Sequence, residues 1–77
     1  MYSLSEVRQH IDSISRPNGY NTYAWNVTKK MAMEVWSCYL SNRPFRKPVN
    51  YFCKEFYQMI RTPEGQYIIP ENKFRTY

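Results

Sequence analysis

Glycine, leucine and alanine are scarce in this sequence of 77 residues, which contains only two of each. Because glycine occurs only at Gly19 and Gly65, the chain has no glycine-rich loop of the kind that holds phosphates in nucleotide-binding enzymes. Because leucine and alanine are rare, other side chains must build the core. Eight Tyr, four Phe, two Trp and four Met are present for this role, and each aromatic side chain buries about 150–250 Å². So short a chain cannot bury them all, and we expect some to form a binding surface.

Histidine and cysteine are too few for the common metal and catalytic sites. His10 is the only histidine, and Cys38 and Cys53 do not form a Cys-x-x-Cys pair, so the pattern of a zinc site is missing. The carboxylates are dispersed, and the sequence places no nucleophile or acid next to the histidine. We therefore expect a non-enzymatic protein with no catalytic residues, metal, cofactor or small-molecule substrate. For the two cysteines we expect buried free thiols, with a disulfide as the alternative.

Long hydrophobic runs are also missing. No apolar stretch approaches the roughly 18–20 residues that cross a bilayer, and the first residues, Met-Tyr-Ser-Leu-Ser-Glu, lack the pattern of a signal peptide. These features predict a soluble, cytoplasmic protein with no membrane partner. The length predicts one small domain over residues 1–77, because so few residues cannot form a second core.

The net charge is +5, from eleven Lys and Arg against six Asp and Glu. A small, basic and aromatic-rich chain suits an anionic partner: nucleic acid, an acidic protein surface or an anionic membrane. The membrane is the weakest of the three, because no predicted helix combines a face rich in Lys and Arg with a strongly apolar one.

The first predicted helix is marked by a capping box. Ser3 is followed three residues later by Glu6, and an apolar seam then continues at spacings of three and four residues. We predict a helix over about residues 4–15, which ends before Pro17 because the residue before a proline disfavours helical geometry.

A second helix is predicted over about residues 23–40, after a turn signal at residues 17–19. At 100° per residue, one half of this helix is apolar, which is the pattern of a helix packed on a core. That half comprises Ala24, Trp25, Val27, Met31, Ala32, Val35, Trp36, Cys38 and Tyr39. Met33 and Leu40 fall within the polar half, where we expect either ordinary exposed apolar residues or a contact with a partner.

A third helix is predicted over about residues 48–61, with Pro48 in its first turn. The β-prone run 66–69 precedes a second turn and could pair with residues 73–77, so that 66–77 form a short β-hairpin or arm. We therefore predict a mainly α fold: a compact three-helix domain with a C-terminal hairpin, in the order of a winged-helix protein.

The basic residues near the third helix give the preferred function. Arg and Lys hold phosphates, while Asn and Gln on a helix face pair with base edges. We predict a small nucleic-acid-binding regulator that contacts DNA through the third helix and the cationic loop before it, although an ordinary solvated helix face presents the same residue types. The predicted nucleic-acid-binding residues are Arg43, Arg46, Lys47, Asn50, Lys54, Gln58, Arg61, Lys73 and Arg75.

The alternative is a protein–protein interaction module, an inhibitor or adaptor that docks on a larger partner. Small, basic and aromatic-rich chains of this kind are common among virus-encoded proteins that act on host factors. The residues predicted for this docking surface are Trp25, Met33, Trp36, Leu40 and Phe45.

Overall fold

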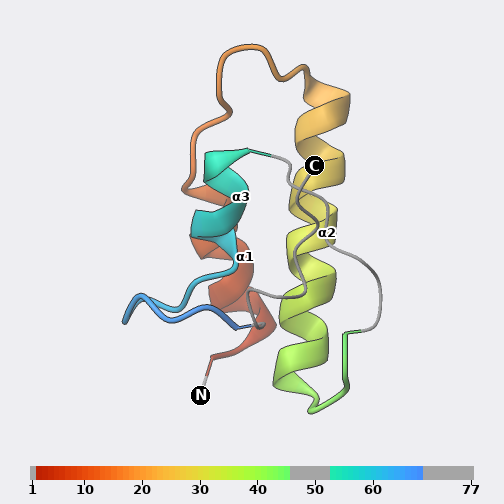
Figure 1. The fold of residues 1–77 in the computed structure, drawn as a ribbon, viewed down its shortest axis with the longest axis vertical. Coiled ribbons are helices and arrows are strands. Elements are labelled where there is room, and N and C mark those ends of the chain that lie inside the picture. The colour runs from red at the N-terminus through yellow and green to blue at the C-terminus, as the bar shows by residue number, and fades with distance from the viewer. Residues whose placement is uncertain (1, 46–52, 69–77) are drawn as a thin grey trace.

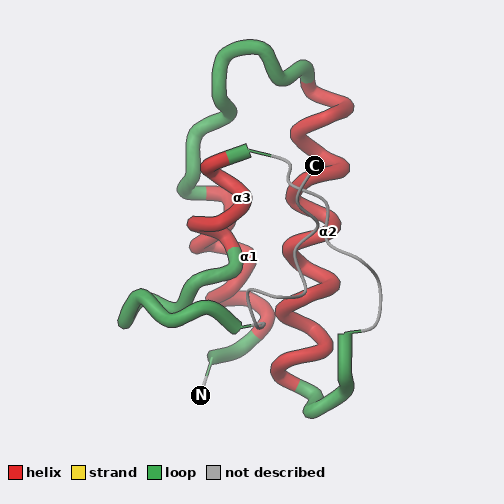
Figure 2. Tube along the Cα trace, in the orientation of Figure 1, coloured by secondary structure: helices red, strands yellow, loops and turns green. Residues whose placement is uncertain are grey.

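Three helices make up the regular structure of the protein (Figure 1). The computed structural model describes residues 2–45 and 53–68, and there α1 spans Leu4–Asp12, α2 spans Thr22–Leu40 and α3 spans Lys54–Met59. These ranges contain no β-strand (Figure 2). α1 and α2 run in opposite directions, and α3 runs in the same direction as α2 (Figure 1). The prediction of a mainly α, compact fold is confirmed.

The beginning of α1 is the predicted capping box. The Ser3 hydroxyl accepts a hydrogen bond from the Glu6 amide at 3.1 Å, and the Glu6 carboxylate accepts one from the Ser3 amide at 3.3 Å. The helix ends at Asp12, three residues before the predicted end at residue 15. Here the Ser13 hydroxyl donates to the His10 carbonyl at 2.6 Å, and serine side chains that bond the backbone in this way compete with helix continuation.

α2 agrees with the predicted range 23–40 except for one additional residue at its start. The Asn21 side chain caps it by accepting a hydrogen bond from the Ala24 amide at 2.8 Å. At its other end Asn42 adopts a left-handed conformation with φ 57°. The amide of Arg43 then bonds the carbonyl of Cys38 at 2.9 Å, which is the pattern of a Schellman C-cap.

α3 is much shorter than the predicted helix over 48–61. Cys53 has an extended backbone, φ −169° and ψ 170°, and it precedes the helix without a side-chain cap. The prediction of one helix that continues from Pro48 into α3 is therefore wrong. Residues 46–52 themselves lie outside the described residues. An apolar periodicity identifies the buried face of a helix but not its first residue, which explains the error.

The segment after α3 turns back on itself. Arg61 and Tyr67 form an isolated antiparallel bridge, flanked by amide-to-carbonyl bonds from Thr62 to Gln66 at 2.8 Å and from Ile68 to Ile60 at 3.1 Å. Gly65, with φ 88°, lies in the turn between the paired residues. The predicted hairpin or arm 66–77 lies mostly outside the described residues, and the described part of it pairs with residues 60–62.

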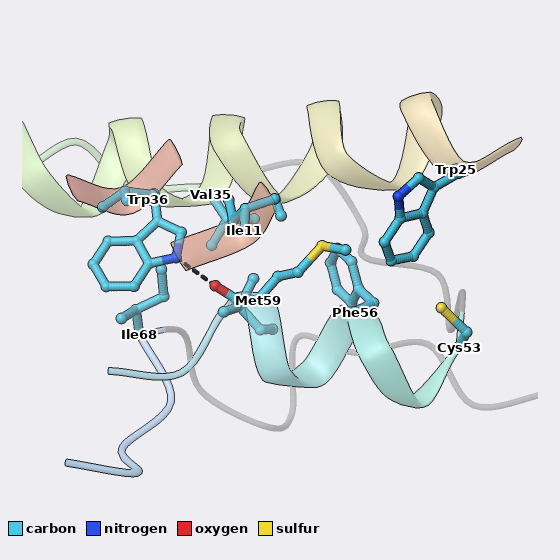
Figure 3. Packing of buried hydrophobic residues seen from close by; sticks show 11 residues of the cluster. Ile11, Trp25, Val35, Trp36, Cys53, Phe56, Met59 and Ile68 are labelled. Atoms are coloured by element: carbon cyan, nitrogen blue, oxygen red, sulfur yellow. Dashed lines mark hydrogen bonds between the residues drawn. The ribbon is translucent and has the colours of Figure 1, made fainter. Parts of the chain in front are cut away.

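One hydrophobic cluster joins all three helices (Figure 3). Trp36 of α2 is buried at one end of the cluster as Figure 3 draws it, and its indole Nε1 donates a hydrogen bond to the Met59 carbonyl of α3 at 2.6 Å. The buried apolar members are Val7, Ile11, Trp25, Ala32, Val35, Trp36, Cys53, Phe56, Met59, Ile60 and Ile68. Cys38 and Cys53 are both free thiols. In the ranges that the structure describes, no helix is both long and apolar enough to cross a membrane.

The buried face of α2 is rotated from the predicted one. Thr28 is completely buried and satisfies its hydroxyl by donating to the Ala24 carbonyl at 2.9 Å. Val27, expected in the apolar half, is 40% exposed, whereas Met33 and Leu40, expected in the polar half, are half-buried against the core. The rotation arises because α2 packs against α1 as well as α3, so that the residues between these two contacts are buried.

Candidate nucleic-acid interface

Four of the nine predicted nucleic-acid-binding residues lie in the described part of the chain, and all four are exposed. They are Arg43, Lys54, Gln58 and Arg61. The other five, for which the structure gives no placement, are Arg46, Lys47, Asn50, Lys73 and Arg75.

Lys54 and Gln58 form an exposed polar strip along α3. They lie four residues apart, so their side chains project from the same face of the helix. The opposite face is fixed in the core by Phe56 and Met59, both completely buried. The Gln58 carbonyl also lies 3.0 Å from His10 Nε2 of α1, and in the tautomer protonated at Nε2 the imidazole donates a hydrogen bond to it. These contacts orient the strip toward solvent.

Arg61 lies two residues after the end of α3 and is held by an aromatic residue. Its guanidinium lies 4.5 Å from the centre of the Tyr67 ring, and one of its terminal nitrogens donates to the Tyr67 hydroxyl at 2.7 Å. The side chain remains exposed. A guanidinium that is stacked and oriented loses less conformational entropy when it binds a phosphate, because its planar fork is already in place.

Arg43 is separate from this strip. Its Nε donates to the Ser41 hydroxyl at 2.9 Å and a terminal nitrogen to the Ser37 hydroxyl at 3.3 Å. Its positive charge thus lies at the C-terminus of α2, where it complements the helix dipole. α2 ends near the bottom of the view in Figure 1, whereas α3 begins in the upper half, so the fold does not bring Arg43 next to Lys54.

The cations of the described ranges are largely unpaired with acids. Between the described residues a single ion pair forms, from Lys29 to Asp12 at 3.4 Å. Glu64, close in sequence to Arg61, instead accepts a hydrogen bond from the Tyr2 hydroxyl at 2.6 Å. This bond is the main cause that raises the pKa of Tyr2 to about 12, and it lowers the pKa of Glu64 below its ordinary value. Within the described ranges, no carboxylate therefore pairs with the positive charges of the strip.

The residues predicted for protein docking are mostly not exposed. Trp36 is 1% exposed and Trp25 is 7% exposed, so both belong to the core rather than to a surface. Met33, Leu40 and Phe45 are half-buried and pack against the same cluster. Hydrophobicity alone selected these residues, and in a chain short of leucine the largest aromatic side chains are needed inside. The exposed large apolar residues of the described ranges are Leu4, Tyr23, Val27 and Tyr39.

Some cations that were in none of the predicted sites are brought together by the fold. Arg8 of α1 and Lys29 and Lys30 of α2 line one groove between these helices. The sequence contains a signal for Arg8, which directly follows the apolar Val7 and so lies at the rim of the buried face of α1. For Lys29 there was none, because it follows Thr28, a polar residue whose burial only the structure shows. Among the described residues, no three His, Cys, Asp or Glu side chains form a possible metal site.

Comparisons with models of protein families, with curated proteins and with solved structures find no match to this chain.

Proposed function

We propose that this protein is a small, non-enzymatic nucleic-acid-binding regulator that contacts the phosphate backbone of DNA through Lys54, Gln58 and Arg61. The observation that supports this most strongly is the exposure of Lys54 on α3 and of Arg61 just beyond it, because neither positive charge forms an ion pair with a described carboxylate. Phosphate contacts by Lys and Arg supply most of the affinity of non-specific nucleic-acid binding.

The geometry of α3 favours contact with phosphates over reading of bases. A helix of six residues is about 9 Å long, and its outer face presents only Lys54 and Gln58. A helix-turn-helix protein joins its recognition helix by a turn of about three or four residues, whereas residues 41–53 separate α2 from α3 here. A winged-helix mode of binding additionally requires residues 66–77 to form a wing that contacts DNA through Lys73 and Arg75.

Charge-neutralising variants test this proposal. Lys54→Gln and Arg61→Gln should each weaken binding to a labelled DNA duplex roughly tenfold at low salt. Each should also reduce the slope of log affinity against log salt concentration by the amount that about one phosphate contact contributes. Arg16→Gln is the matched control, because Arg16 is an exposed cation in the loop between α1 and α2 and its removal changes the net charge equally. Fluorescence anisotropy measures all three. Equal affinities for the three variants would contradict the assignment of the site.

A docking function remains the second candidate because of a different surface. Tyr23 and Val27 lie four residues apart in the first turns of α2, where they are 78% and 40% exposed. If the protein binds another protein, we propose that these residues contact it. In that case Tyr23→Ala should weaken the complex measured by calorimetry, with little dependence on salt, while Lys54→Gln leaves it unchanged.

A further inference from the structure

The groove between α1 and α2 has the charge of an anion site. It has a volume of about 330 Å³ and is formed by both helices. Arg8 and Asp12 contribute from α1, and Asn26, Lys29 and Lys30 contribute from α2. The volume is at the lower end of the roughly 300–1,000 Å³ that ligand clefts occupy.

The charges in the groove do not cancel. Asp12, the only carboxylate among the described residues that line the groove, pairs with Lys29 at 3.4 Å, and this pair is close to neutral as a unit. Arg8 and Lys30 are exposed and form no ion pair with a carboxylate in the described ranges. They approach the groove from opposite helices, so an anion between α1 and α2 can contact a cation on each side.

Apolar side chains lie deeper in the same groove. Ile11 is 1% exposed and Met33 is half-buried, whereas Arg8, Asn26 and Lys30 are exposed. A ligand with both an anionic and an apolar part can therefore place its charge at the rim and its apolar part against the interior. Sugar–phosphate groups have this character, which an inorganic anion lacks.

We infer that the α1–α2 groove is a phosphate-binding site, in which Arg8, Lys30 and the Asn26 amide hold the phosphate groups of a nucleic-acid strand. Arg8 can bind phosphate oxygens in a bidentate way, Lys30 adds a point charge, and an Asn side chain is a common donor to phosphate oxygens. The assignment of the phosphate to a nucleic acid rests on the proposed function, but the assignment of a phosphate site to the groove does not. The site is distinct from the Lys54–Arg61 strip, because it lies between α1 and α2 rather than on α3.

Nuclear magnetic resonance tests the site directly. The ¹⁵N-labelled protein is titrated in separate experiments with pyrophosphate, with a short oligothymidylate and with oligoglutamate at equal charge concentration. The Asn26 side-chain amide is the main reporter, since it lines the groove and gives its own pair of signals. We expect pyrophosphate and the oligothymidylate to shift these signals, and oligoglutamate to shift them little.

Two variants link the shifts to the cations. Arg8→Gln and Lys30→Gln should each reduce the affinity for the oligothymidylate severalfold and lower the salt slope by about 0.7. Arg16→Gln, a cation outside the groove, serves as the control for net charge. Glutamine is nearly as good a helix former as arginine or lysine, so these variants should keep the fold.

The outcomes separate this inference from the proposed function. Shifts at Asn26 with pyrophosphate but not with the oligothymidylate would support the site and overturn its nucleic-acid source. Oligothymidylate shifts confined to α3 would overturn the groove and leave the proposed function standing. No shift at Asn26 with either phosphate ligand, or an equal shift with oligoglutamate, would overturn a phosphate site.

Discussion

α1 and α3 both pack against α2, but they are stabilised by different means. α1 has a complete capping box at Ser3 and Glu6 that stabilises its first turn locally, and it also inserts two residues into the core. α3 has no side-chain cap and only six residues, too few for an isolated helix to be stable in water. It is held by its buried residues and by the hydrogen bond from Trp36 to its Met59 carbonyl. The proposed phosphate-binding strip therefore depends on tertiary packing.

The strongest test of this difference is removal of the α3 aromatic anchor. Phe56 is completely buried, and Phe56→Ala should lower the free energy of unfolding by about 3–5 kcal/mol because it leaves a cavity in the core. Urea titrations followed by circular dichroism measure the loss. Tyr23→Ala, at a mostly exposed aromatic position on α2, should stay within about 0.5 kcal/mol of the native protein. A small effect of the Phe56 variant would mean that α3 is not anchored as described.

A smaller effect is expected from the hydrogen bond between α2 and α3. Trp36→Phe removes the donor to the Met59 carbonyl and should cost about 1–3 kcal/mol for the unsatisfied buried acceptor, in addition to the lost ring atoms. Trp25→Phe is the matched control, because it removes the same atoms where the indole has no hydrogen bond to another described residue. Equal losses in the two variants would show that the hydrogen bond contributes nothing.

For α1, we expect that loss of the side-chain cap destabilises the start of the helix locally. Ser3→Ala removes the side-chain cap and should cost about 1 kcal/mol in the free energy of unfolding. Ser5→Ala lies in the first turn of the same helix, where the side chain makes no hydrogen bond to a described residue, and it should have little effect. Hydrogen exchange of the α1 amides should increase in the first variant only. Equal exchange in both would remove the capping box as a source of α1 stability.

These two helices also show how much could be predicted from the sequence. Ser3, Glu6 and the apolar spacing after them identified α1, and the turn signal at residues 17–19 with the apolar pattern after it gave a start for α2 that proved correct within one residue. The start of α3 was not predictable, because an apolar periodicity marks the buried face of a helix but not its first residue, and the contacts of its C-terminal carbonyls with Trp36 and His10 are created only by the fold. For the same reason the pairing of Arg61 with Tyr67 was missed. The exposure of Lys54 and Gln58 did follow from the apolar pattern around them.

The smallest expected effect concerns the contact from the N-terminal segment to the turn after α3. The Tyr2 hydroxyl donates to Glu64, which raises the pKa of Tyr2 from 10.0 to about 12 and lowers that of Glu64 from 4.5. The stabilisation that this hydrogen bond gives is therefore fully present at a pH between the ordinary pKa of Glu64 and the ordinary pKa of Tyr2. It is lost as the pH rises through the raised pKa of Tyr2 or falls through the lowered pKa of Glu64.

Tyr2→Phe removes the hydroxyl and keeps the ring that packs edge-on against Trp36 at 5.7 Å. The native protein should be slightly more stable than the variant at neutral pH, and the difference in urea midpoints should vanish in strong alkali and in acid. A difference independent of pH would contradict the role of the hydrogen bond.

The proposed function requires that exposed Lys and Arg side chains bind the phosphate backbone, and the salt dependence of DNA binding is the first property to measure. Anisotropy of a labelled duplex is measured with the native protein at about 50 and 200 mM salt. We expect sub-micromolar binding at the lower concentration and a fall of at least tenfold at the higher one, because each phosphate contact releases counterions. No binding at either concentration, or binding that does not change with salt, would contradict it.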